Sequence, residues 1–151
     1  MRLWRISAHA DLSGDGGLRT SGRWHSRGNR VVYLADHPAS ALLEVLVHLE
    51  VDPEDLPDSY QLLAVDIPDS VPFLAIGSDE LPAGWPGRPE LTRERGDRWL
   101  RDRRTVLLRV PSAIVPFAVN WLANPAHPDI ADARIAGVFQ APFDPRFFIA
   151  R

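Results

Sequence analysis

The feature that most constrains this chain is a helix-forming segment, residues 38–50, in which one acid is surrounded by apolar residues. Pro38 is a favourable first helical residue. Glu44 has alanine, leucine or valine at most neighbouring positions, and a helix that is apolar on nearly every side is normally buried. A carboxylate on such a helix needs a hydrogen-bonding partner or a chemical role. We therefore expect a buried helix and treat Glu44 as the first candidate site residue, with a structural ion pair as the alternative.

Two short segments before this helix supply candidate partners for the acid. Arg23 and Arg27 lie in a glycine-flanked loop, where backbone amides can approach a ligand closely. Arginine forks beside such amides suit a phosphate group, although exposed arginines in ordinary surface ion pairs are the alternative. Tyr33 follows in an apolar segment, either as a core residue or as a ring that stacks on a base or on nicotinamide.

Two further polar side chains, Ser112 and His48, are weaker candidates. A lone serine is usually a turn residue, and no Gly-x-Ser-x-Gly pattern surrounds Ser112, so a hydrolase nucleophile is not indicated. His48 lies four residues after Glu44 and could pair with it on one helical face. The five histidines show no recognised ligand spacing and the chain has no cysteine, so we expect no metal site.

The order of the predicted elements indicates a mixed α+β fold. Residues 68–89 are expected to be mostly loop, residues 111–116 to stay extended, and residues 120–129 to form a short turn or helix followed by a loop. Strands outnumber helices and follow one another irregularly, which favours one α+β domain over a doubly wound fold. The expected strands are 3–7, 31–35, 60–67, 105–110 and 146–150, and the expected helices are 38–50 and 91–103.

Composition and charge exclude several classes of protein. The net charge of −3 does not favour a polyanionic partner, and acids dilute the arginines of residues 93–104, so we expect no direct nucleic-acid binding. All 17 basic residues are arginines, which removes lysine Schiff-base chemistry. No segment approaches 18 consecutive apolar residues and no signal-peptide run is present, so we expect a cytoplasmic protein that does not enter a membrane.

Six segments follow one another in a distinctive order: SGRWHSRG at 21–28, VVYLA at 31–35, ALLEVLVHL at 41–49, LLRVPSAIVP at 107–116, NPAHPD at 124–129 and FDPRF at 143–147. In this order they resemble the RES domain family, which is named for an arginine, a glutamate and a serine. The resemblance implies that Arg23, Glu44 and Ser112 are those residues, with Tyr33 as a fourth member of the site. His25 stands where we expect asparagine, which could alter ligand contacts in the loop.

The resemblance also implies a fold and a function. It implies a single RES domain over residues 1–151, with a split, mostly antiparallel sheet and flanking helices, similar to ADP-ribosyltransferases. It further implies a toxin of a type II toxin–antitoxin pair with NAD as substrate. RES toxins deplete NAD by hydrolysis or phosphorolysis, or attach ADP-ribose to a protein. Their antitoxins carry an Xre-like DNA-binding region and a segment that covers the active site, so a hetero-oligomer with such an antitoxin is expected.

These side chains suit cleavage of the bond between nicotinamide and ribose. Nicotinamide leaves as a neutral group, so the transition state mainly needs negative charge near a ribosyl cation, and Glu44 is the candidate. Arg23 and Arg27 are expected to bind phosphate, and Tyr33 to orient the nicotinamide ring. Ser112 is expected to hydrogen-bond the ribose, the nicotinamide or Glu44. The acceptor stays open between water, phosphate and a protein side chain. The alternatives from other classes are an inactive antitoxin-binding module and a ribonuclease, which would need a basic cleft.

Overall fold

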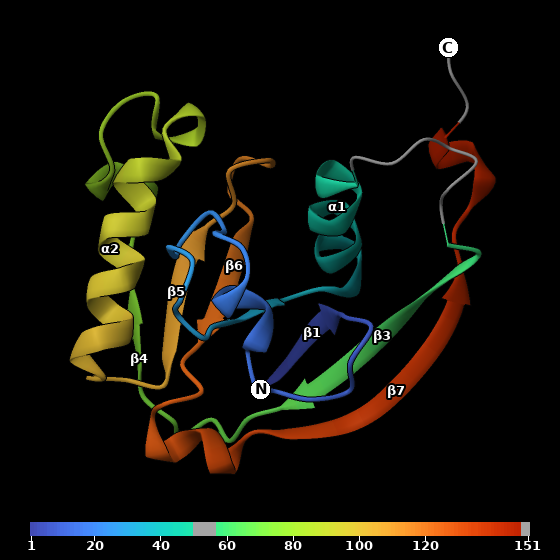
Figure 1. The fold of residues 1–151 in the computed structure, drawn as a ribbon, viewed down its shortest axis with the longest axis horizontal. Coiled ribbons are helices and arrows are strands. Elements are labelled where there is room, and N and C mark those ends of the chain that lie inside the picture. The colour runs from blue at the N-terminus through green and yellow to red at the C-terminus, as the bar shows by residue number, and fades with distance from the viewer. Residues whose placement is uncertain (50–56, 149–151) are drawn as a thin grey trace.

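The computed structural model describes residues 1–49 and 57–148, which form one seven-stranded sheet with two α-helices (Figure 1). The predicted α+β fold is therefore confirmed. The helices are α1 (Pro38–His48) and α2 (Pro89–Asp102). The strands are β1 (Arg2–Ile6), β2 (Val32–Ala35), β3 (Ser59–Asp66), β4 (Phe73–Ala75), β5 (Leu107–Pro111), β6 (Val119–Ala123) and β7 (Arg134–Pro142).

The sheet consists of two halves that barely join. Its strand order is β4-β5-β6-β2-β1-β3-β7, and among the described residues every neighbouring pair is antiparallel except β4 and β5. β1 and β2 share a single paired position, Trp4 opposite Ala35. Figure 1 shows β3 and β7 running away from this junction in a different direction from β5 and β6. The split, mostly antiparallel sheet expected from the sequence is thus present, with its weak point next to the start of α1.

The register of β2 and β6 decides which side chains share a face of the sheet. Tyr33 lies opposite Leu122, and Ala35 lies opposite Asn120. Residues two apart on a strand point to the same side, so Tyr33, Asn120 and Leu122 occupy one face. α2 covers part of this face, because Trp99 belongs to the same buried cluster as Leu122. A second buried cluster, which includes Leu3, Val32, Leu63, Leu107 and Trp121, fills the opposite face.

α1 begins where the sequence predicts. Pro38 is its first residue, and the Nδ1 atom of His37 accepts a hydrogen bond of 3.1 Å from the Ala39 amide, which satisfies one free donor of the first turn. The helix ends at His48, and the predicted end at Glu50 lies outside the described residues. Neither α1 nor any other helix in the described part of the chain is long and apolar enough to cross a membrane.

The predicted burial of α1 is wrong. Only Ala41 on this helix is buried, Val47 is 54% exposed, and Glu44 is half-buried. The helix packs against β1 and β2, at the junction of the two half-sheets. One side of α1 therefore contacts the sheet, while most of its other apolar side chains are only partly buried by the described residues. The Glu44 side chain is half-buried, so part of it remains accessible to solvent.

Several other predictions for single segments are also wrong. β6 occupies the start of the segment expected to be a turn, and β4 and β7 were not predicted at all. Residues 112–118 turn back instead of staying extended, because the Ser112 amide donates to the Ala118 carbonyl at 2.9 Å. Pro145–Phe148 form a 3-10 turn instead of a closing strand, and residues 149–150 lie outside the described ranges. The other predicted strands and helices are present with shifted ends.

Candidate active site

Glu44 is joined to two side chains that are distant from it in sequence. The Ser112 hydroxyl donates to Glu44 Oε1 at 3.1 Å, and the Asn120 side-chain amide donates to the same oxygen at 2.6 Å. Because Asn120 projects from the face of the sheet that carries Tyr33, α1 must lie over that face too. We find no hydrogen bond from the described residues to the second oxygen, Oε2. The carboxylate is thus held at one oxygen and open at the other.

Ser112 holds its position through a local turn. It follows β5 directly, and its Oγ accepts hydrogen bonds from the amides of Ile114 and Val115 at 3.1 and 3.3 Å. A hydroxyl has one proton and two lone pairs. With both lone pairs used by amides, the proton is available for Glu44. The structure therefore brings Ser112 and Glu44 together, as one of the roles considered for the serine requires.

Tyr33 is held by a hydrogen-bonded network rather than left free in the core. Its hydroxyl accepts from the Trp24 amide at 3.0 Å and lies 2.8 Å from His25 Nδ1. His25 Nε2 lies 3.0 Å from the Thr20 carbonyl, which can only accept, so Nε2 carries the proton and Nδ1 accepts from Tyr33. Burial raises the pKa of Tyr33, with the nearby charge of Arg23 acting against that rise, and burial lowers the pKa of His25. The neutral imidazole thus orients the phenol.

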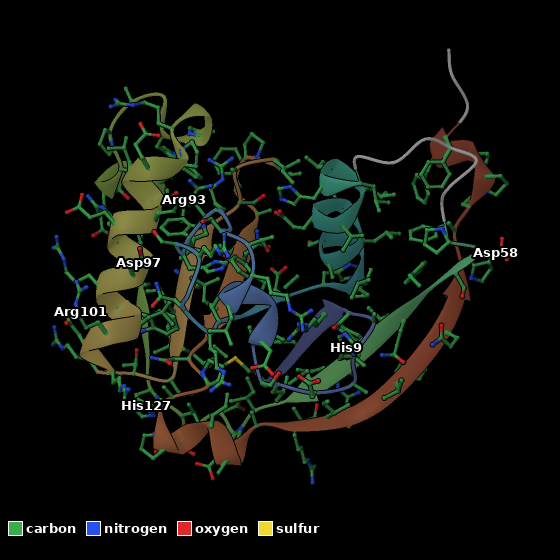
Figure 2. All side chains as sticks on the ribbon, in the orientation of Figure 1. His9, Asp58, Arg93, Asp97, Arg101 and His127 are labelled. Atoms are coloured by element: carbon green, nitrogen blue, oxygen red, sulfur yellow. The ribbon has the colours of Figure 1, made fainter. Side chains whose placement is uncertain are left out.

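The loop that carries Arg23 is fastened to α2. The Thr92 hydroxyl donates to the Arg23 carbonyl, and the Arg93 guanidinium donates to the Gly22 carbonyl at 2.8 Å. The Asp97 carboxylate accepts from the Ser26 amide at 2.8 Å. Arg93 and Asp97, both labelled in Figure 2, thus hold the loop from one side of the helix.

The side chain of Arg23 is half-buried and partly free. Its Nη1 donates to the Pro86 carbonyl at 2.7 Å, which fixes its direction. The Trp24 amide, next to Arg23 in the chain, donates to the Tyr33 hydroxyl at 3.0 Å, so the backbone after Arg23 lies against Tyr33. A guanidinium has five donors, and a single carbonyl uses only one of them. The remaining donors suit a planar anion such as phosphate.

Comparison with known proteins identifies the family of this chain. A family model described as the RES domain matches residues 2–145. The chain belongs to the RES domain family. The match spans both halves of the sheet and all four predicted catalytic positions, so it does not depend on any single motif.

Relatives of this RES chain are named as toxins. A Toxin Res from Pseudomonas putida is 55% identical over 138 residues, which cover 89% of this chain and 92% of that one. A Prs ADP-ribosylating toxin from Sphingobium sp. is 39% identical, with coverage of 95% and 94%. The solved M. tuberculosis MbcT–MbcA toxin–antitoxin complex contains a chain of the same fold, with a TM-score of 0.66 and 18% identity over 97% of this chain and 86% of that chain. The chain thus shares its family with proteins named as toxins, and its fold with a chain of a solved toxin–antitoxin complex.

Two side chains singled out in the sequence, Arg27 and His48, have no described hydrogen bond to the candidate site around Glu44. Arg27 is exposed, and among the described residues only its backbone amide makes a hydrogen bond, donating to Ser21 Oγ at 2.9 Å. His48 is exposed as well, and within the described residues no hydrogen bond joins it to Glu44. Phosphate binding by Arg27 therefore stays a prediction. The described residues also contain no group of three or more histidine, aspartate or glutamate side chains placed to hold a metal ion.

One residue that contacts Glu44 was missed in the sequence: Asn120. It falls in a segment whose asparagines and prolines were interpreted as a turn, although the residues between Asn120 and Asn124 form a short continuous apolar run, as in a buried strand. Recognition of the strand would have placed Asn120 and Leu122 on one face. Its contact with Glu44 could not have been found in this way, because 76 residues separate the two.

Proposed function

We propose that this RES toxin binds NAD and cleaves its nicotinamide–ribose bond. The observation that carries the proposal is the way in which the Glu44 carboxylate is held. Its carboxylate is anchored at one oxygen by Ser112 and Asn120, no hydrogen bond from the described residues reaches the other, and the side chain is half-buried on an otherwise apolar helix. A fixed carboxylate with an open oxygen is suited to stabilise a cation that forms next to it.

The chemistry requires little more than this charge. As the bond between nicotinamide and C1′ of the ribose lengthens, its electron pair leaves with the ring nitrogen, and neutral nicotinamide departs without a proton donor. Positive charge then develops on the ribose, as in glycoside cleavage. The open oxygen of Glu44 stabilises this charge. The hydrogen bonds at the anchored oxygen keep the carboxylate in position throughout, so no reorganisation is needed during the reaction.

The other residues bind and orient the dinucleotide. Arg23 supplies free guanidinium donors for the pyrophosphate, and Arg27, on the same loop, adds charge nearby. Tyr33 offers the face of its ring to nicotinamide while its hydroxyl is held by His25. His25 thus takes the place of the expected asparagine without loss of the anchor for Tyr33.

Water or phosphate is the proposed acceptor, which gives hydrolysis or phosphorolysis and depletes NAD. ADP-ribosyl transfer to a protein side chain is the second candidate, and the name of the Sphingobium relative, an ADP-ribosylating toxin, favours it. All three reactions share loss of nicotinamide as their first step. The residues of the site therefore support the first step equally for each acceptor.

We also propose that a cognate antitoxin with an Xre-like region covers this site. The solved structure of the same fold is a toxin–antitoxin complex. Exposed apolar side chains flank Glu44: Val47 lies one turn further along α1, and the loop after Ser112 presents Val115 and the fully exposed Phe117. Apolar surface of this kind beside a catalytic residue is suited to bind a protein segment.

The decisive experiment compares Glu44→Gln with wild type and with Glu94→Gln, a control that removes an exposed carboxylate from α2. Each purified protein is incubated with NAD, and nicotinamide release is measured. Wild type and Glu94→Gln should release nicotinamide, whereas Glu44→Gln should lose at least about 100-fold in rate, the usual effect of removing a key electrostatic group. In cells, Glu44→Gln should be non-toxic and leave NAD levels normal.

Mass spectrometry of the products, with and without phosphate or lysate protein, identifies the acceptor. Nicotinamide release at the wild-type rate by Glu44→Gln would remove the acid from the mechanism. No release by wild type would favour the inactive binding module, and cleavage of added RNA would favour a ribonuclease.

A further inference from the structure

We infer that Asn120 is a positioning residue of this enzyme: its amide sets the orientation of Glu44 so that the open oxygen of the carboxylate faces the substrate. The inference rests on the proposed cleavage of NAD. It concerns a side chain that carries no role in the sequence pattern. Its basis is the hydrogen bond of 2.6 Å between Asn120 Nδ2 and Glu44 Oε1, the shorter of the two that Glu44 accepts from the described side chains.

The position of Asn120 makes its amide a rigid donor. β6 is an interior strand, paired with β5 on one side and β2 on the other. Asn120 itself lies opposite Val110 on β5 and Ala35 on β2. Both neighbours are almost fully buried, so the backbone at this point has little freedom to move. Asn120 therefore presents its donor from the most constrained part of the sheet.

The two donors to Glu44 differ in the freedom they allow. The Ser112 hydroxyl can rotate about its Cβ–Oγ bond, and it lies in the loop after β5 rather than within a strand. An amide donor is planar, with its two N–H groups in fixed directions. Because both donors reach Oε1, they hold the same oxygen and leave Oε2 without a described partner. The amide on the strand therefore determines where the held oxygen of the carboxylate lies.

Glu44 needs this support because of its location. It is half-buried on α1, a helix on which Ala41 is the only described residue that is buried. A glutamate side chain has three rotatable bonds, and without a fixed donor it would sample several rotamers. Misplacement of a catalytic group by about 1 Å can cost about 100-fold in rate. The contribution of Asn120 is therefore expected in kcat and not in binding of NAD.

The first test is Asn120→Ala, compared with wild type and with Gln140→Ala. The control removes a side-chain amide from β7 whose only described contact is a 3.3 Å bond to Gln61. Nicotinamide release is measured over a range of NAD concentrations with the full chain. Asn120→Ala should lower kcat about 10- to 100-fold and change KM less than about 3-fold. Gln140→Ala should change neither constant.

The second test, Asn120→Asp, gives a readout that a purely structural residue would not change. At neutral pH the new carboxylate would face Glu44 and repel it. At acidic pH the pair shares one proton, and the new carboxyl group, once protonated, can donate to Oε1 as the amide does. The pH–rate profile of Asn120→Asp should therefore fall toward neutral pH and recover toward acid, relative to wild type at each pH. This variant keeps the shape of the side chain, so it remains informative if Asn120→Ala does not fold.

The outcomes separate this inference from the function on which it rests. If Glu44→Gln abolishes nicotinamide release while both Asn120 variants keep the wild-type kcat and pH profile, the positioning role is refuted and NAD cleavage stands. A rise in KM at unchanged kcat also refutes it, because Asn120 would then act in substrate binding. If wild type releases no nicotinamide, the proposed function fails and the role of Asn120 fails with it.

Discussion

At Gly96, one added methyl group should both destabilise the fold and displace part of the candidate site. It lies inside α2 and packs against the backbone of the loop that carries Arg23. A Cβ atom at Gly96 would lie 1.7 Å from the Trp24 carbonyl oxygen and 2.8 Å from the carbonyl carbon. Ordinary contact begins at 3.4 Å, so the helix and the loop would have to separate by about 1.7 Å.

The size of the effect follows from two opposing contributions. Alanine is a better helix former than glycine by about 1 kcal/mol, which alone would stabilise α2. Against this, forcing an extra group into a packed site costs about 1–3 kcal/mol. Separation would also weaken the hydrogen bonds from Thr92 and Arg93 to the loop carbonyls, each worth about 1 kcal/mol. We expect Gly96→Ala to be destabilised by about 2 kcal/mol, and its Tm to fall by about 4–8 °C.

The assay compares Gly96→Ala with Gly87→Ala. At Gly87 an added Cβ meets nothing within 4 Å, and the backbone does not adopt a positive φ. Thermal unfolding should therefore separate the two variants, with Gly87→Ala at or above the wild-type Tm. Nicotinamide release should fall in Gly96→Ala below the unfolding temperature, because the loop with Arg23 is displaced. A Gly96→Ala protein with unchanged Tm and full activity would show that the contact between α2 and the loop is not as tight as described.

Two further predictions concern the network around Tyr33. Because burial lowers the pKa of His25, the unfolded chain binds a proton near pH 6.5 that the folded chain excludes. The free energy of unfolding should thus fall as pH drops below about 6.5, by at most about 1.4 kcal/mol per pH unit. Urea unfolding at several pH values should show that this free energy depends less on pH in His25→Asn than in wild type. Tyr33→Phe leaves the Trp24 amide and His25 Nδ1 without their partner and should cost about 1–3 kcal/mol in urea unfolding, whereas Tyr60→Phe, whose hydroxyl makes no described hydrogen bond, should cost little.

The elements with strong local signals were predicted well. The start of α1 follows from Pro38 and the apolar run after it, and the strands with many β-branched residues are present near their expected positions. β6 and β7 were missed because asparagine, glycine, alanine and proline interrupt the strand-forming residues in their sequences. Pairing with neighbours makes them strands: β6 lies between β5 and β2, and β7 extends along β3.

The residues of the candidate site also divide into those predicted from the sequence and those found only in the structure. Arg23, Tyr33 and Glu44 lie within 22 residues of one another, in segments whose types and order are distinctive, so the sequence alone pointed to them and to the RES family. Ser112 was identified only through that resemblance, and its hydrogen bond to Glu44 spans 68 residues. Asn120 was not identified at all.

The class of fold, the acid on an apolar helix, the loop with Arg23 and the family could all be predicted from the amino-acid sequence, because they depend on residue types and on spacings of a few residues. Three features became visible in the folded chain alone: α1 stays partly exposed, Asn120 and Ser112 meet at one oxygen of Glu44, and α2 holds the loop with Arg23. Periodicity and propensity act within one or two turns of chain. Contacts across 68 and 76 residues depend on how the strands pair, which no local pattern specifies.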